Sequence, residues 1–272
     1  PIVTGYDSER PIENSYVIPG IRKIDVNSQL DPSYNFDTFI EGDCNRLARQ
    51  AGRSIVDNPG KSTFNPLFIY GGTGLGKTHL AQAIGIAVKE KFPNLVVRYV
   101  TGSEFKTQYM NAVAVQNKMT DFLAFYMRMD VLIVDDIQDL RGHGTQNAFF
   151  SVFNHLHQNG KQLVFTSDRA PVELQDFEER LLSRFKWGLS VQLSHPDYKT
   201  RISMLTAKAE REGVELPSEV LEFLASRVKT NFRELEGALI SLIAHASVEK
   251  HKSLMELAGT ITETLVGDEK SE

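Results

Sequence analysis

One short segment restricts the fold of this chain more than any other: Gly71-Gly72-Thr73-Gly74-Leu75-Gly76-Lys77-Thr78. It follows an almost wholly apolar run, residues 66–70, and precedes apolar residues at helical spacing, which predicts a loop between a buried strand and a helix. Its glycines let backbone N–H groups turn toward a common centre. By composition, a chance match of this pattern has odds of about 1%. The segment therefore predicts a phosphate-binding loop.

This loop predicts the phosphate ligands in detail. Lys77 would reach the β- and γ-phosphates, and the Thr78 hydroxyl would ligate Mg²⁺. The expected cofactors are therefore ATP or ADP with Mg²⁺, and the alternative is a glycine-rich turn beside a surface lysine. His79 is the least certain member, because it suits packing at the helix N-terminus better than catalysis. The nucleotide-binding residues expected here are Gly72, Thr73, Gly74, Gly76, Lys77, Thr78 and His79.

A second acidic site is expected where another apolar strand, residues 131–134, ends in Asp135 and Asp136. Ligands of parallel α/β folds bind beyond the carboxyl ends of the strands. We expect Asp135 to hold Mg²⁺ through water and Asp136 to orient or deprotonate the attacking water. The alternative is a solvated acidic pair at a strand end.

Strand and helix patterns alternate through the first two thirds of the chain, which predicts a parallel five-stranded sheet with right-handed crossovers. Beyond Pro196 the pattern is purely helical, which predicts a small all-α lid subdomain. Asn231, with Glu234 three residues later, is a capping pair at one helix start. The expected parts are 1–33, a linker or extended segment; 34–194, the nucleotide-binding subdomain; 195–266, the lid; and 267–272, a disordered tail.

Composition limits the remaining possibilities. The net charge of -5 argues against a protein that wraps duplex DNA. Cys44 is the single cysteine, so no disulfide can form within the chain, and no apolar run reaches 18 residues. We expect a soluble, cytoplasmic protein without a membrane span. His143, His155 and His157 do not form a coherent metal-ligand pattern.

Several longer segments together resemble the bacterial chromosomal replication initiators of the DnaA family, whose ATPase module is an AAA+ P-loop NTPase. The similarity covers roughly residues 34–265. Its most specific stretch is Asn231-Phe232-Arg233-Glu234-Leu235-Glu236-Gly237-Ala238-Leu239. Further matches are the segments 65–72, 135–138, 166–169 and 180–189.

The resemblance implies roles that composition alone does not. Asp168 would sense the γ-phosphate, Arg233 would touch ATP within the same subunit, and Ile40 with Asn45 would hold adenine. Arg184 would be the arginine finger that reaches the ATP of a neighbouring subunit. The alternatives are a surface ion pair for Arg184, and pairing of Arg233 with Glu234 or Glu236. Arg180 would support the finger, and Trp187 is expected to be structural.

The resemblance also implies a function. The chain would bind ATP, hydrolyse it slowly, and assemble into ATP-dependent oligomers or filaments at the chromosomal origin to promote unwinding. The insert at residues 103–128 would wedge between successive subunits. The replicative helicase is an expected partner of the full-length protein. The alternatives are a helicase loader or an initiator-regulating paralogue, and, from another class, a metabolic P-loop kinase.

Two departures from the family pattern concern DNA. Family members carry a C-terminal helix-turn-helix domain that reads duplex origin boxes, whereas this sequence stops at Glu272. Either a truncated chain or a relative without that domain would explain this, and duplex binding would depend on the missing domain. The loop at residues 138–145 offers only Arg141 and His143 as basic candidates, opposed by Asp139. Weak binding of single-stranded DNA is therefore expected.

Overall fold

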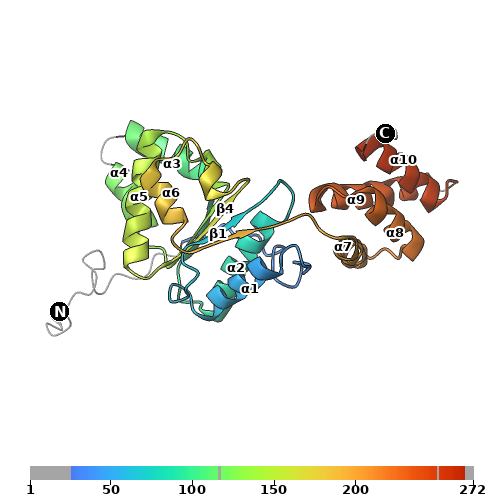
Figure 1. Cartoon of the computed structure of the whole chain (residues 1–272), viewed down its shortest axis with the longest axis horizontal. Helices are drawn as coiled ribbons and strands as arrows, with labels where there is room; N and C mark the ends of the chain where they lie inside the picture. Colours follow the sequence, from blue (N-terminus) through green and yellow to red (C-terminus); the bar gives the residue numbers. More distant parts are fainter. Residues whose placement is uncertain (1–25, 116–117, 250, 267–272) are drawn as a thin grey trace, which may run out of the picture.

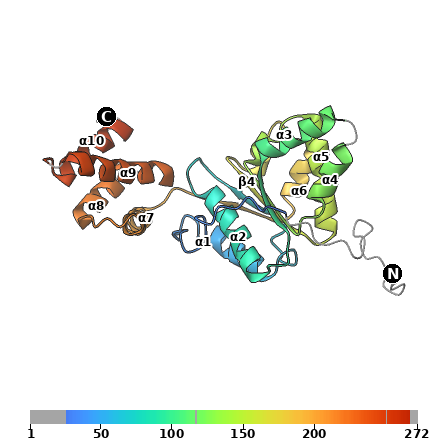
Figure 2. The same cartoon turned by 180° about the vertical axis from the view of Figure 1, so that it is seen from behind.

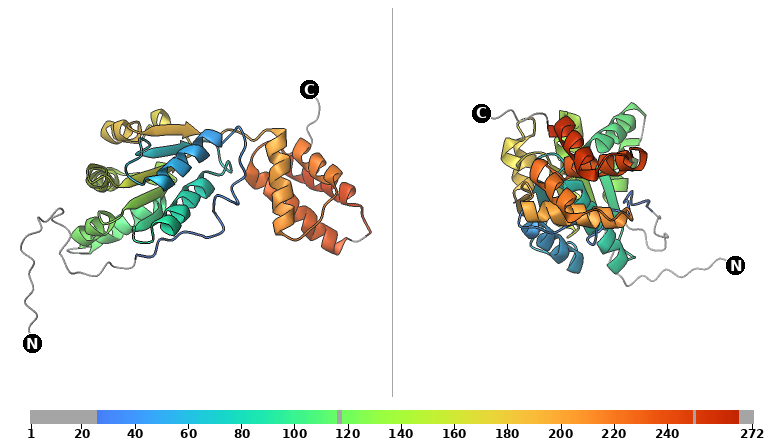
Figure 3. Two further views of the ribbon diagram at one scale, coloured as in Figure 1. Left: turned by 90° about the horizontal axis from the view of Figure 1, so that it is seen from below. Right: turned by 90° about the vertical axis from the view of Figure 1, so that its right-hand side faces the viewer.

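The computed structural model describes residues 26–115, 118–249 and 251–266, and two parts are evident in it: a sheet covered by helices and a helical bundle (Figure 1). Residues 1–25 of the expected N-terminal linker and the expected tail, 267–272, lie outside the described residues. The bundle lies beyond one end of the sheet (Figure 3). The fold is α/β with a helical lid, as predicted.

Five parallel strands form the sheet, in the order β2-β3-β4-β1-β5. Strand β4 therefore separates the strand that leads into the glycine-rich loop, β1, from the strand that ends in Asp135, β3. All three carboxyl ends meet at one edge of the sheet. The strands are β1 (Leu67–Tyr70), β2 (Val97–Thr101), β3 (Val131–Asp135), β4 (Gln162–Ser167) and β5 (Leu189–Gln192).

Both faces of the sheet are apolar, which is typical of strands buried between two helical layers. On one face, Leu67, Ile69 and Ile133 pack with α1 (Arg46–Asp57) and α2 (Lys77–Lys91). Phe68, Val134 and Phe165 face the other layer. That layer contains α3 (Gly102–Ala114), α4 (Lys118–Tyr126), α5 (His143–Gln158) and α6 (Glu179–Phe185) (Figure 2). Two short 3-10 turns follow β3 and β4, at Ile137–Asp139 and Pro171–Glu173.

The bundle has its own core, in which Leu224, Leu239 and Ala258 are buried. Its helices are α7 (Tyr198–Arg211), α8 (Ser218–Arg227), α9 (Phe232–Val248) and α10 (Leu254–Val266). The predicted capping pair begins α9, because the Asn231 side chain accepts a hydrogen bond from the Glu234 N–H at 2.9 Å. No helix among the described residues is long and apolar enough to cross a membrane.

Candidate active site

The glycine-rich loop has the backbone that its composition predicts. Gly74 and Gly76 have φ angles of 73° and 90°, in the left-handed region that favours glycine. The Lys77 ammonium donates hydrogen bonds to the carbonyls of Gly71 at 2.9 Å and Gly72 at 2.8 Å. It forms no ion pair with any described residue, and burial lowers its pKa although Asp136 and Asp135 act in the opposite direction. An incoming phosphate would therefore supply the counter-charge of a largely buried cation.

The metal-ligand candidates lie in direct contact. Asp135 is 3% exposed, and its Oδ2 accepts hydrogen bonds from the Thr78 hydroxyl at 2.8 Å and the Tyr99 hydroxyl at 2.7 Å. Its Oδ1 accepts one from the Thr166 hydroxyl. No group of three or more His, Cys, Asp or Glu side chains suited to a metal occurs among the described residues. One hydroxyl and one carboxylate fit Mg²⁺, which takes few protein ligands and completes its shell with phosphate and water.

Asp136 lies one residue beyond the sheet, with φ 52° and ψ 57°. The Gln138 amide donates to its Oδ1 at 3.1 Å, and its own N–H donates to the Thr166 hydroxyl at 2.9 Å. Burial raises the pKa of Asp136 above the usual aspartate value. A fixed carboxylate with a raised pKa is better suited to accept a proton than an ordinary surface aspartate.

Asp168 follows β4 and therefore lies between the phosphate loop and Asp136. The Arg169 guanidinium binds its two carboxylate oxygens at 2.8 and 2.7 Å, and this pairing lowers the pKa of Asp168. The backbone N–H of Asp168 donates to Gln138 Oε1 at 3.4 Å. Arg169 thus offsets the negative charge that Asp168 would present to a phosphate.

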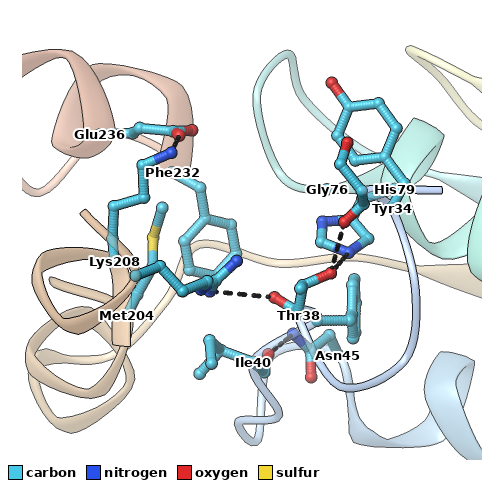
Figure 4. Close-up of a pocket in the computed structure, with 13 residues that line it drawn as sticks. Tyr34, Thr38, Ile40, Asn45, Gly76, His79, Met204, Lys208, Phe232 and Glu236 are labelled. Atoms are coloured by element: carbon cyan, nitrogen blue, oxygen red, sulfur yellow. Dashed lines mark hydrogen bonds and ion pairs between the residues drawn. The ribbon is translucent and has the colours of Figure 1, made fainter. Parts of the chain in front are cut away.

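A cavity of about 310 Å³ lies between the sheet part and the lid (Figure 4). Ile40 and Asn45 line it, and the Asn45 amide donates to the Ile40 carbonyl at 2.9 Å, which fixes the segment expected at adenine. Across the cavity, the lid contributes a mixed apolar and charged wall: Met204, Lys208, Arg211, Phe232 and Glu236.

His79 lines the same cavity and packs against the segment at residues 34–38. Its Nε2 lies 3.0 Å from both the Thr38 hydroxyl and the Asn35 carbonyl, and its ring lies 5.1 Å from that of Tyr34. Burial lowers its pKa. His79 therefore packs against the segment that forms one cavity wall, and its expected contact with nucleotide stays a prediction.

The lid touches the phosphate loop directly. The Phe232 N–H donates to the Gly74 carbonyl at 3.0 Å. Arg233, the second residue of α9, therefore lies beside the phosphate loop. The two acidic residues that the sequence offers as partners of Arg233 form contacts with other side chains. Glu236 pairs with Lys208 at 2.6 Å, and Glu234 accepts from Asn231 and Thr230. Within the described residues, Arg233 forms no ion pair.

Arg184 lies apart from these groups, at the end of α6. Its guanidinium lies over Trp187 at 4.7 Å and near Phe150 at 6.0 Å, and it forms no ion pair with any described residue. Arg180, one turn earlier, pairs with Glu178 at 2.5 Å and lies over Phe150 at 4.4 Å. Among the described residues, no hydrogen bond, ion pair or ring contact joins Arg184 to the phosphate loop of its own chain.

Several neighbours of the site were not singled out from the sequence. Tyr99 and Thr166 reach Asp135 only because β2 and β4 flank β3, and Lys208 reaches the cavity only because α7 faces the sheet part. Their sequence signals are weak, since a tyrosine or threonine in a strand is ordinary. Arg169 is the exception, because it directly follows Asp168 at a strand end and could have been proposed as its partner.

The sheet order, the glycine-rich loop after β1, the acidic end of β3 and the helical lid define an AAA+ P-loop NTPase. The sequence matches the family described as "Bacterial DnaA ATPAse domain" over residues 30–192. The chain belongs to this family.

Individual relatives agree with this assignment. A chromosomal replication initiator protein DnaA of Flavobacterium psychrophilum is 53% identical over 262 residues, 96% of this chain and 55% of that protein. The structure of domain III of the Thermotoga maritima replication initiation protein DnaA superposes with a TM-score of 0.82 at 40% identity, covering 88% of this chain and 99% of that one. A replication initiator DnaA bound to AMPPCP and single-stranded DNA gives a TM-score of 0.74 at 34% identity, covering 82% and 70%.

The chain spans about half the length of the curated relatives it matches. Structures of a RuvB branch migration motor from Thermotoga maritima and of DnaI, at 17% and 19% identity, share only the fold.

Proposed function

We propose that this chain is the ATP-binding and ATP-hydrolysing module of a replication initiator. The observation that carries the proposal is the contact between Thr78 and Asp135 at 2.8 Å, beside the Lys77 ammonium, which forms no ion pair within the part of the chain that the structure describes. A bound Mg²⁺·ATP would supply the metal that neutralises phosphate charge and the phosphoanhydride that is cleaved. The Ile40–Asn45 segment and the lid wall would hold its base and ribose.

Each residue of the site has a separate role in binding or hydrolysing ATP. Lys77 would bind the β- and γ-phosphate oxygens, and Thr78 and Asp135 would hold Mg²⁺, Asp135 through water. Asp136 orients the attacking water and accepts its proton, while Gln138 keeps that carboxylate in place. Asp168 contacts the γ-phosphate region with its charge offset by Arg169. Arg233 reads the nucleotide state from the lid of the same chain.

Hydrolysis would be completed by a second copy. An arginine at the γ-phosphate stabilises charge in the transition state, and one supplied in trans makes hydrolysis depend on assembly. We assign this role to Arg184, with Arg180 in support. The resulting protein is a slow, Mg²⁺-dependent switch that forms ATP-dependent oligomers or filaments, with α3 and α4 wedged between successive subunits.

The proposed DNA and protein partners rest on one related structure and on the family resemblance. One related initiator was solved with single-stranded DNA, and we propose weak single-strand binding for this chain. Recognition of duplex origin boxes and contact with the replicative helicase belong to the full-length protein. The runner-up is an AAA+ helicase loader or an initiator-regulating paralogue.

The first test measures hydrolysis per molecule as protein concentration rises. The proposed function predicts ATP-dependent assembly, phosphate release into water, and a specific rate that increases with concentration. Lys77→Ala is the control, because it should neither bind ATP well nor assemble. A specific rate independent of concentration would contradict the trans arrangement, and phosphate transfer to an added small acceptor would favour the kinase alternative.

A further inference from the structure

Four side chains form a continuous stack that runs from the core of the sheet part to its surface: Phe153, His157, Trp187 and Arg184. Phe153 is fully buried, and its ring lies 5.7 Å from that of His157 at an interplanar angle of 9°. The His157 and Trp187 rings follow at 4.4 Å and 30°. The Arg184 guanidinium ends the stack, 4.7 Å from the indole.

The backbone around Trp187 is fixed on both sides. Its N–H donates to the Arg184 carbonyl at 3.1 Å, which closes the end of α6. The following residue, Gly188, lies so close to Pro66 that a Cβ would come within 2.0 Å of the Pro66 carbonyl oxygen. The indole is therefore held from the core side by His157 and along the chain by its neighbours, although 57% of Trp187 is exposed.

Arg184 depends on this stack for its position. Within the described residues its contacts are with aromatic faces, those of Trp187 and Phe150, and its buried Nε has no hydrogen-bond partner. Arg180 differs, because Glu178 pairs with it. A guanidinium held by an aromatic face keeps its N–H groups free for an external anion, whereas one held by a carboxylate does not.

We propose that Trp187 is a positioning residue for Arg184: it holds the guanidinium in the orientation that reaches the triphosphate bound to a second copy of this chain. The inference rests on the trans role proposed for Arg184. Trp187 itself touches no nucleotide and acts through the arginine. Because the exposed indole flanks Arg184, it also forms part of the surface that the second copy covers.

The expected effect is moderate. A cation–π contact contributes about 0.5–2 kcal/mol, depending on its desolvation. This range corresponds to roughly two- to thirtyfold in rate. Loss of the indole should therefore weaken the concentration-dependent part of hydrolysis by less than loss of Arg184 itself.

The test compares two replacements in the 272-residue chain. Trp187→Phe retains an aromatic face, whereas Trp187→Leu retains an apolar side chain without one. We expect Trp187→Leu to lose the concentration-dependent rate by about two- to thirtyfold and Trp187→Phe to retain most of it. ATP affinity at low protein concentration should be unchanged in both. Arg227→Ala is the matched control, because it removes an exposed arginine that lies over Phe223 in the lid, far along the chain from the stack.

A spectroscopic readout separates positioning from folding. Trp187 is the sole tryptophan of the sequence, so its emission reports this site alone. ATP-driven assembly should shift the emission to shorter wavelength as the indole is covered, and Arg184→Ala should abolish that shift together with assembly. Should Trp187→Leu fail to fold, His157→Ala carries the test, because it removes the support behind the indole and predicts a smaller loss of the same kind.

The outcomes distinguish the two claims. If Arg184→Ala leaves concentration-dependent hydrolysis intact, the proposed trans function fails and this inference with it. If Arg184→Ala abolishes it but Trp187→Leu matches the unmodified chain, only the positioning role is overturned. Equal losses in Trp187→Phe and Trp187→Leu would also overturn it, because an aromatic face would then not be what holds Arg184.

Discussion

The charged groups of the phosphate site have different partners from those of a second region, the arginine edge, which consists of His157 of α5, Arg184 of α6 and Trp187. At the phosphate site, Asp135 receives three hydroxyl donors, and Lys77 finds two carbonyls within its own loop. At the edge, the Arg184 guanidinium lies against the Trp187 and Phe150 rings, and its buried Nε has no acceptor among the described residues. The first region holds its charges within one chain. The second leaves a cation without an ion-pair partner among the described residues, which is the arrangement we propose for a group that completes the site of another copy.

The largest expected effect distinguishes Arg184 at the edge from Arg233, which lies beside the phosphate site. Arg184→Ala should lower assembly-stimulated hydrolysis by up to about a thousandfold, the lower end for arginine fingers, because the function we propose is that of a slow switch. It should leave the ATP affinity of the monomer nearly unchanged. Arg233→Ala should weaken that affinity, since Arg233 lies beside the phosphate loop. Calorimetry at low protein concentration and phosphate release at high concentration measure the two quantities separately. Loss of monomer ATP binding in Arg184→Ala would remove the contrast between the regions.

The next effect concerns the phosphate site alone. Lys77→Ala removes a charge-assisted contact with phosphate worth roughly 1.5–3 kcal/mol, so ATP affinity should fall at least about tenfold. Isothermal calorimetry with Mg²⁺·ATP measures it, and Lys89→Ala, an exposed lysine later in the same helix, is the control. An unchanged dissociation constant would contradict the assignment of the loop.

A stability measurement tests how much the hydrogen bond from Tyr99 to Asp135 contributes to the free energy of unfolding. Tyr99→Phe removes the hydroxyl that donates to Asp135 at 2.7 Å. A hydrogen bond to a charged group contributes about 1.5 kcal/mol at the lower end, so the free energy of unfolding without nucleotide should fall by about that amount. Tyr70→Phe is a matched control, because the structure gives the Tyr70 hydroxyl no partner among the described residues. Equal urea midpoints for both variants would show that the Tyr99 contact contributes nothing.

The smallest expected effect is a pH dependence of stability. Burial lowers the pKa of His79 in the folded chain below its ordinary value of 6.5. As the pH falls, the unfolded chain therefore takes up a proton on His79 at a higher pH than the folded chain does. The contribution of neutral His79 to the free energy of unfolding is complete above pH 6.5 and is lost as the pH falls below 6.5. Melting temperatures at about pH 7.5 and about pH 5.5 should differ less in His79→Gln than in the unmodified chain. His251→Gln, an exposed histidine, should match the unmodified chain. A slope unchanged by His79→Gln would refute this.

Much of the fold could be predicted because its signals are local. The apolar run at β1, the glycine-rich loop and the acidic end of β3 each depend on adjacent residues, and parallel strands bring their carboxyl ends to one edge. Of the three hydroxyls around Asp135, that of Thr78 was expected at the metal site, whereas those of Tyr99 and Thr166 could not be predicted, because they reach Asp135 only through the order of the strands. The same holds for the lid wall, where Lys208 and Phe232 come from different helices. Trp187, expected to be structural, is more than half exposed and lies between α6 and β5, and its ring packs against His157 of α5, a contact between segments far apart in the sequence.

The central claim is that a nucleotide site of one copy is completed by Arg184 of another, and mixing two inactive variants tests it most directly. Arg184→Ala retains an intact phosphate loop, and Lys77→Ala retains an intact arginine. Each alone should lack assembly-stimulated hydrolysis. In an equimolar mixture, Arg184 of one copy can meet the phosphate loop of the other, so partial activity should return. A mixture that co-assembles and yet releases no more phosphate than the separate variants would contradict the account, and Arg184 would then act within its own chain or only in its folding.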